Sequence, residues 1–135
     1  MTPFGEKIRD LRRQRGVTLK QLAGALELSP AYLSALEHGH RGLPTPAFIV
    51  QICEYFHLIW DDYEEMHRLA RLSHPRVVVD TRGLSPTATE LANLLAGRIG
   101  DLDEASMTAI IEKLRASDAG PRRPRRQRRR RVSQT

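Results

Sequence analysis

The sequence predicts an all-α fold in which five short helices form one domain, and a short strand and a helical appendage follow. Three observations lead to this prediction. Apolar residues recur at helical spacing through most of the chain. A Ser or Thr followed by Pro, a common start of a helix, occurs at Thr2, Ser29, Thr45 and Ser85. Only one segment, residues 76–81, has the β-branched composition of a strand.

The first helix is expected to begin at Pro3 and to end at Gly16. Phe4, Ile8 and Leu11 lie at helical spacing and form its apolar face. Arginines crowd its last turn, where cations interact favourably with the helix dipole. Gly16 then ends the helix, because glycine readily adopts the left-handed conformation found at helix ends.

Two shorter helices are expected between residues 17 and 39. Thr18 and Gln21 have the spacing of a capping box, so the second helix begins after Thr18. Ser29 caps the third helix and Pro30 occupies its first position, only about three residues after the second helix ends. Gly39 closes the third helix. The sequence therefore predicts two short helices joined by a tight turn.

The fourth and fifth helices complete the predicted first domain. Thr45 caps the fourth helix, in which Ile49, Ile52 and Phe56 belong to one apolar stripe. Acidic residues fill the first turn of the fifth helix, where negative charge is favourable. Pro75 ends that helix, because proline disfavours helical backbone in the residue before it.

The sequence after residue 73 predicts a small second region followed by a tail. A strand is expected at residues 76–81, one helix after Ser85 and a last helix after Gly100. About forty residues bury too little surface to fold alone, so these apolar faces must pack on the first domain or on a second copy, and we favour the second copy. The predicted domains are 1–73, 74–118 as a dimerisation region, and 119–135 as a disordered Arg-rich tail.

The charges are distributed unevenly along the chain. The formal net charge is +6, yet residues 121–135 hold eight Arg and no acidic residue, whereas residues 1–120 hold 14 basic and 16 acidic residues. Within that body, residues 1–41 carry seven basic and four acidic residues. A positive N-terminal region, an acidic middle and a cationic tail indicate three segments with different partners. The tail can attract phosphates without reading their sequence.

The segment from Gly16 to Gly39 resembles the Cro and phage-repressor type of helix-turn-helix, found in the xenobiotic-response-element family of bacterial regulators. The resemblance covers about residues 4 to 70 and implies a repressor-like, five-helix DNA-binding domain. The residues that carry it are Thr18, Leu22, Ala23, Ser29, Leu33, Ser34, Glu37 and Gly39.

Two positions depart from the family pattern. Glu27 stands where family members usually have glycine in the turn, so this residue is left-handed or the turn has a different shape. Many phage repressors read bases through Gln at the starts of the two helices, but here Leu19, Pro30 and Ala31 occupy these positions. The preferred base sequence therefore cannot be transferred from the family.

The resemblance implies that the helix beginning at Pro30 lies in the major groove of DNA. Its outward side chains would contact base edges, and neighbouring polar and basic groups would contact phosphates. The expected DNA-binding residues are Thr18, Lys20, Ser29, Ala31, Tyr32, Ser34, Ala35, His38, His40 and Arg41.

Several classes of protein are disfavoured. The single cysteine, Cys53, rules out an internal disulfide and a Cys-cluster zinc site, and His38 and His40 lack further ligands at metal-binding spacing. The sequence contains no pattern typical of a catalytic nucleophile or of a phosphate-binding loop. We therefore expect no catalytic activity, no bound metal and no cofactor. The chain also has no signal peptide and no membrane span, which predicts a cytoplasmic, nucleoid-associated protein.

The function predicted from the sequence is a sequence-specific transcriptional regulator, a homodimeric repressor that reads an inverted repeat in double-stranded DNA. One alternative is the antitoxin of a toxin-antitoxin pair, which would bind DNA and also hold a toxin through residues 85–118. Another is an architectural nucleic-acid binder led by the Arg-rich tail, which would have no preferred sequence.

Overall fold

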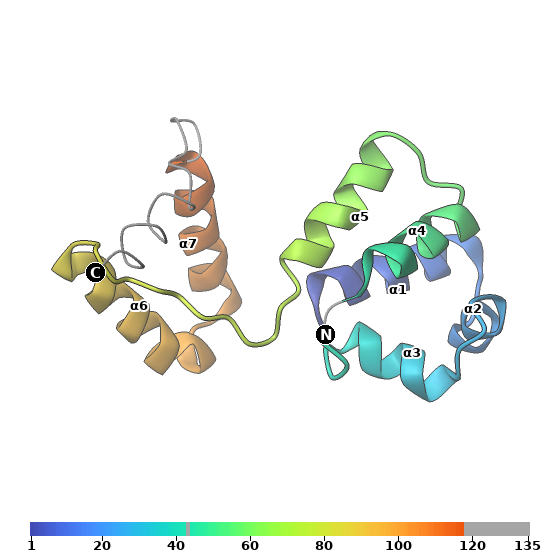
Figure 1. Ribbon diagram of the computed structural model, residues 1–135, viewed down its shortest axis with the longest axis horizontal. Helices are drawn as coiled ribbons and strands as arrows, with labels where there is room; N and C mark the ends of the chain where they lie inside the picture. The colour runs from blue at the N-terminus through green and yellow to red at the C-terminus, as the bar shows by residue number, and fades with distance from the viewer. Residues whose placement is uncertain (43, 118–135) are drawn as a thin grey trace, which may run out of the picture. The chain divides into compact units, whose positions relative to one another are not determined.

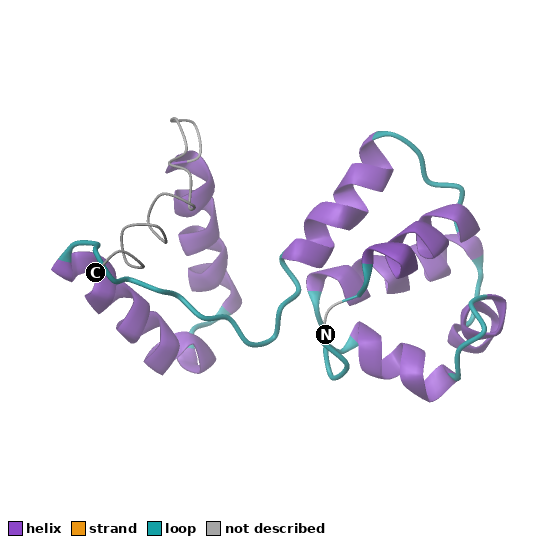
Figure 2. Ribbon diagram, in the orientation of Figure 1, coloured by secondary structure: helices purple, strands orange, loops and turns teal. Residues whose placement is uncertain are grey.

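The computed structural model describes residues 1–42 and 44–117, and in this part of the chain every regular element is a helix (Figures 1 and 2). The predicted Arg-rich tail at 119–135 lies outside the described residues. The elements are α1 (Pro3–Arg15), α2 (Leu19–Ala25), α3 (Pro30–Glu37), α4 (Pro46–Tyr55), α5 (Asp61–Arg71), α6 (Pro86–Arg98), the 3₁₀ turn η1 (Ile99–Asp101) and α7 (Glu104–Ala116).

The predicted strand at residues 76–81 is wrong. These residues follow an irregular path, and no strand occurs within the described ranges (Figure 2). Val77, Val78 and Val79 are all exposed. Their β-branched side chains favour extended backbone, but a strand also needs a second strand beside it. The sequence offers no second segment of this composition, so the segment stays unpaired.

Helix starts follow the capping chemistry expected from the sequence. The hydroxyl oxygens of Thr2, Ser29, Thr45 and Ser85 each accept a hydrogen bond from a backbone N–H in the first turn of the following helix. Each of these helices has Pro at its first position, where a missing N–H costs no hydrogen bond. The four predicted starts are confirmed.

The chain divides into two compact units, Met1–Val77 and a second unit from Val78 onward. In the first unit, α1 packs on α3 and α5, α2 packs on α3, and α4 packs on α5. These helices enclose one apolar core, formed by Phe4, Ile8, Leu11, Leu22, Ala23, Leu33, Ile49, Ile52, Cys53, Phe56, Met66 and Ala70.

The second unit contains α6, η1 and α7, and none of the residues in these three elements is buried. The domain boundary predicted at residues 73 and 74 stays a prediction. No helix among the described residues is long and apolar enough to cross a membrane.

Candidate nucleic-acid interface

The α2–turn–α3 segment begins with the predicted capping box. The Thr18 hydroxyl accepts from the backbone N–H of Gln21 at 3.0 Å, and the Gln21 side-chain oxygen accepts from the backbone N–H of Thr18 at 2.9 Å. Both bonds use groups that would otherwise lack a partner at the start of a helix. The start of α2 is therefore fixed by its own sequence.

The turn between α2 and α3 contains a left-handed residue. Glu27 has φ 59°, so it adopts the conformation that glycine would adopt with less strain. The backbone N–H of Leu28 donates to the Ala23 carbonyl at 2.8 Å, which closes the end of α2. Of the two possibilities left open by the sequence, the turn keeps a left-handed residue at this position and tolerates a side chain there.

One side of α3 is held firmly against the core. Leu33 and Leu36 are buried, and Ala23 of α2 is completely buried beside the joint of the two helices. Gly5 of α1 lies so close to α3 that a Cβ atom built on it would be 2.7 Å from the Glu37 Cα. The close approach of α1 to the end of α3 therefore requires glycine at position 5.

The end of α3 is also tied to α1 by polar contacts that the sequence analysis did not find. Glu37 is 2% exposed, and its carboxylate lies 3.4 Å from an Arg12 guanidinium nitrogen. Its backbone carbonyl accepts from the Thr2 backbone N–H at 3.1 Å and from the Thr2 hydroxyl at 3.3 Å. The position of Arg12 could have indicated this contact from the sequence. Arg12 follows Ile8 by four residues, so it lies on the same, buried face of α1.

The buried carboxyl of Glu37 has a raised pKa. Burial raises it by disfavouring the charged form, and the nearby Arg12 opposes this effect without cancelling it. A buried charge that loses its partner is strongly destabilising. The Arg12–Glu37 pair therefore acts as a structural constraint on the position of α3.

The opposite side of α3 presents the side chains expected to contact bases. Ala31, Tyr32 and His38 are exposed, whereas Ser34 and Ala35 are half-buried at the edge of this side. His38 Nδ1 lies 2.8 Å from the Ser34 carbonyl oxygen, which holds the imidazole along the helix. Four of the five predicted base-contacting residues thus lie on α3, and the fifth, His38, is its C-cap residue. Together they present small, hydroxyl and imidazole groups on the outer side of this segment.

The residues expected to contact phosphates surround α3 in sequence. Lys20, His40 and Arg41 are exposed, and the Arg41 guanidinium carbon lies 5.5 Å from the centre of the Tyr32 ring. Such a contact is a cation–π interaction, so Arg41 and Tyr32 restrain each other. Thr18 and Ser29 are exposed caps whose oxygens already accept a hydrogen bond from the helix, but each hydroxyl can still donate one.

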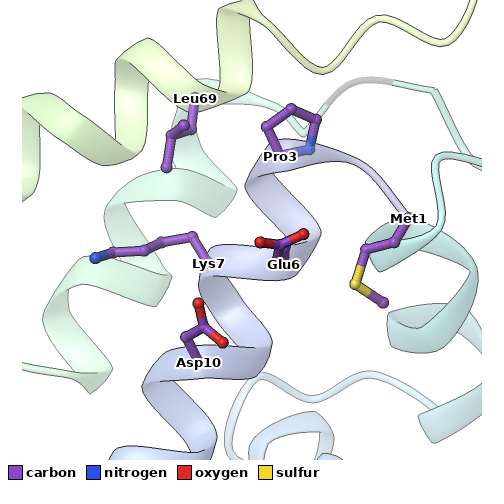
Figure 3. Close-up of a pocket in the computed structure, with 6 residues that line it drawn as sticks. All are labelled: Met1, Pro3, Glu6, Lys7, Asp10 and Leu69. Atoms are coloured by element: carbon purple, nitrogen blue, oxygen red, sulfur yellow. The ribbon is translucent and has the colours of Figure 1, made fainter. Parts of the chain in front are cut away.

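A shallow hollow at the start of α1 is formed by other residues. Its volume is about 360 Å³, and Pro3, Glu6, Lys7 and Asp10 of α1 line it together with Met1 and Leu69 (Figure 3). None of the predicted DNA-binding residues lies there. Among the described residues, no group of His, Cys, Asp and Glu is arranged to hold a metal ion.

Comparison with known proteins finds similarity in the first unit. A family model described as a helix-turn-helix domain matches residues 3–66. The chain is 46% identical over 52 residues to the uncharacterised HTH-type transcriptional regulator RghRB of Bacillus subtilis, a match covering 38% of this chain and 37% of that protein. It is 44% identical over 54 residues to the transcriptional repressor RghR of the same organism, covering 40% of each protein.

A third match, to the transcriptional regulator RamB of Mycobacterium tuberculosis, is 44% identical over 55 residues and covers 41% of this chain but 11% of that protein. The chain thus matches about two fifths of the length of the two Bacillus regulators. No solved structure matches it. Residues 3–66 are therefore similar to the helix-turn-helix domains of known transcriptional regulators.

Proposed function

We propose that this protein is a sequence-specific DNA-binding transcriptional regulator in which α3 is the recognition helix. The observation that carries the proposal is the contrast between the two sides of α3. One side is fixed by Leu33, Leu36 and the buried Glu37, while the other presents small and polar side chains on the surface. A rigid helix with such an exposed side fits the major groove of B-DNA.

Within this proposal, each exposed group on α3 and its C-cap residue His38 has a role that follows from its chemistry. The methyl groups of Ala31 and Ala35 suit contacts with thymine methyls. The hydroxyls of Tyr32 and Ser34 and the imidazole of His38 can hydrogen-bond to base edges. These five residues would therefore determine which bases are preferred.

The phosphate contacts would come from the residues that flank α3. Lys20 and Arg41 supply positive charge, and the exposed imidazole of His40 supplies a hydrogen-bond donor. The hydroxyls of Thr18 and Ser29 supply two further donors next to the helix starts. Such contacts set the position of the protein on DNA and its affinity, but they do not distinguish sequences.

The proposal extends to a homodimer that represses transcription by occupying its operator. A two-fold symmetric pair would place two recognition helices about 34 Å apart, one turn of DNA, and would read an inverted repeat. We propose that it acts in the cytoplasm at the nucleoid, where its DNA ligand is found. Repression fits the name of the relative RghR, a transcriptional repressor.

A second candidate is an antitoxin that binds a toxin through residues 85–118. It is favoured by the exposed apolar side chains of α6, η1 and α7, among them Leu91, Ile99 and Leu114. A protein partner would cover such surfaces. Co-purification of the chain with the product of an adjacent small gene would support this candidate.

Selection of preferred sequences from random duplex DNA tests the main proposal. The full chain would be used at about 0.2 M salt, which weakens the non-specific attraction of the Arg-rich tail for phosphates. Enrichment of an inverted repeat with half-site centres about 10 bp apart is the expected result. If no sequence is enriched at any salt concentration that permits binding, the protein is not a sequence-specific regulator.

A further inference from the structure

Over its described residues, 78–117, the second unit has defined helices but no buried residue. No residue of α6, η1 or α7 is buried. Instead, large apolar side chains on these elements are between 36% and 61% exposed. We call this set the apolar face of the second unit: Leu91, Leu94, Leu95, Ile99, Ile110, Ile111 and Leu114.

The ends of these helices are nevertheless well specified by the sequence. Ser85 caps α6 and Asp103 caps α7, each through a hydrogen bond from a backbone N–H in the first turn. The Thr89 hydroxyl donates to the Thr81 hydroxyl oxygen at 2.8 Å, which ties the preceding loop to α6. The chain therefore encodes two definite helices while leaving their apolar residues uncovered.

Two helices of this size need packing to be stable. Each is 13 residues long, close to the length at which an isolated helix is only marginally stable in water. In proteins most of the stability of such helices comes from burial of an apolar face. Because nothing within α6, η1 and α7 is buried, their stability requires a further surface to pack against.

The apolar residues are arranged in stripes that suit a helical partner. Leu91, Leu95 and Ile99 follow one another at four-residue intervals and so share one side of α6 and its continuation into η1. Ile110, Ile111 and Leu114 share one side of α7. Figure 1 shows α6 and α7 as two helices joined by the short turn at η1. Stripes of this kind are what helical bundles bury.

We infer that the apolar face of the second unit packs on the same face of a second copy, and that this unit is folded only when paired. The inference rests on the proposed homodimer and deepens it, since it assigns the contact surface and makes folding of α6 and α7 depend on assembly. DNA occupancy would then depend on the concentration of the protein itself, because dissociation of the dimer would separate the two recognition helices and unfold the second unit.

A second copy is favoured over another partner by area and by charge. A stable interface uses about 800 Å² on each partner, and seven Leu and Ile side chains of one short unit, each 36% to 61% exposed, contribute to such an area. Residues 78–117 carry four basic and six acidic residues, so both signs are present and neither dominates. A surface for a strongly charged partner would carry mainly the opposite sign.

The full chain tests this inference through its dependence on concentration. All seven aromatic residues precede Val78, so near-ultraviolet circular dichroism reports the first unit alone, whereas the signal at 222 nm reports helices in both units. We expect part of the 222 nm signal to melt at a temperature that rises between about 1 and 100 µM protein, as linkage to assembly requires. Sedimentation equilibrium over the same range should show a dimer that dissociates on dilution.

A matched pair of variants identifies the surface. Leu95→Glu places a charge on the apolar face and should weaken self-association at least tenfold while leaving the near-ultraviolet spectrum unchanged. Gly97→Glu places the same charge elsewhere on α6, where a Cβ atom meets nothing within 4 Å, and should leave self-association unchanged.

Three results would overturn the inference. A chain that stays monomeric at 100 µM with all its helices formed would show that the second unit needs no partner. A monomer lacking these helices would show that another molecule covers them. Equal weakening by both variants would place the contact elsewhere. A dimer that selects no DNA sequence would instead refute the proposed function and leave this inference standing.

Discussion

Gly5→Ala should severely destabilise the first unit, because the backbone of α1 at position 5 lies too close to the Glu37 backbone to leave room for a Cβ atom. A Cβ atom at this position would lie 2.6 Å from the Glu37 carbonyl carbon and 2.7 Å from its Cα. These are backbone atoms, so no side-chain rotation relieves the clash. The end of α3 would have to move away from α1, which stretches the hydrogen bonds from Thr2 to the Glu37 carbonyl.

The size of the effect can be worked out from these contacts. Overpacking costs about 1–3 kcal/mol, and a clash with rigid backbone belongs at the upper end of that range. Weakening of the Thr2 hydrogen bonds adds about 1 kcal/mol. The higher helix propensity of alanine offsets about 1 kcal/mol of this loss in stability. The net loss of about 3 kcal/mol should lower the Tm of a unit of this size by roughly 10–20 °C.

Near-ultraviolet circular dichroism measures this loss without interference from the second unit. Gly24→Ala is the matched control, because Gly24 lies within α2 and a Cβ atom there meets nothing within 4 Å. The control should raise the free energy of unfolding by about 0.5–1 kcal/mol. If Gly5→Ala leaves the Tm within about 3 °C of the parent, less than the change expected from 1 kcal/mol, the claimed close approach of α1 to α3 is wrong.

The remaining predictions concern DNA contacts, pH and the turn. Lys20→Ala and Arg41→Ala should weaken binding to all DNA sequences alike, and each should reduce the slope of log K against log salt by about 0.9; an unchanged slope would mean that the side chain contacts no phosphate. The raised pKa of Glu37 means that the folded state binds its proton more tightly than the unfolded state, so the contribution of this carboxyl to stability is present at low pH and is lost as the pH rises through its folded pKa. Urea denaturation between pH 4 and 8 should therefore show the parent losing stability relative to Glu37→Gln as the pH increases, and the opposite trend would contradict the assigned burial effect. Glu27→Gly should stabilise the first unit by about 0.5–1 kcal/mol, because it relieves a left-handed residue at some cost in chain entropy; a lower Tm would show that the Glu27 side chain makes a compensating contact.

Helix starts could be predicted from the sequence wherever the determinant was local. The caps at Thr18, Ser29 and Ser85 act within one turn of the chain, so residue type and spacing were sufficient. The start of α5 is different, since Trp60 precedes it with φ 53° and no side-chain cap. No residue-type rule anticipates a left-handed tryptophan, because that conformation depends on the surrounding fold.

Features that depend on distant partners were predicted less well. The strand at residues 76–81 failed because composition indicates extended backbone but not a neighbour to pair with. The Arg12–Glu37 pair was missed because charged residues are seldom buried, and its two members are 25 residues apart. The apolar stripes of α6 and α7 could be read from spacing, but spacing does not identify the surface that covers them.

The placement of the candidate site's residues could be predicted because the helix-turn-helix combines local capping with a characteristic pattern of buried positions, whereas their contacts with DNA stay a prediction. Leu33 and Leu36 had to face the core, which left Tyr32 and Ser34 toward the outside. The base preference proposed for these side chains depends on their fit to DNA, so residue type alone did not predict it.

The central claim, that the outer side of α3 reads bases, is tested most directly by comparing base preferences. The relative affinities of all single-base variants of the selected operator would be measured for the parent, Ser34→Ala and Tyr32→Ala, with Gln51→Ala on α4 as an exposed control. We predict that the two α3 variants relax or change the preference at one or two positions in each half-site, by about 1–3 kcal/mol, and that Gln51→Ala changes none. Identical preferences for all four proteins would contradict the assignment of α3 as the recognition helix.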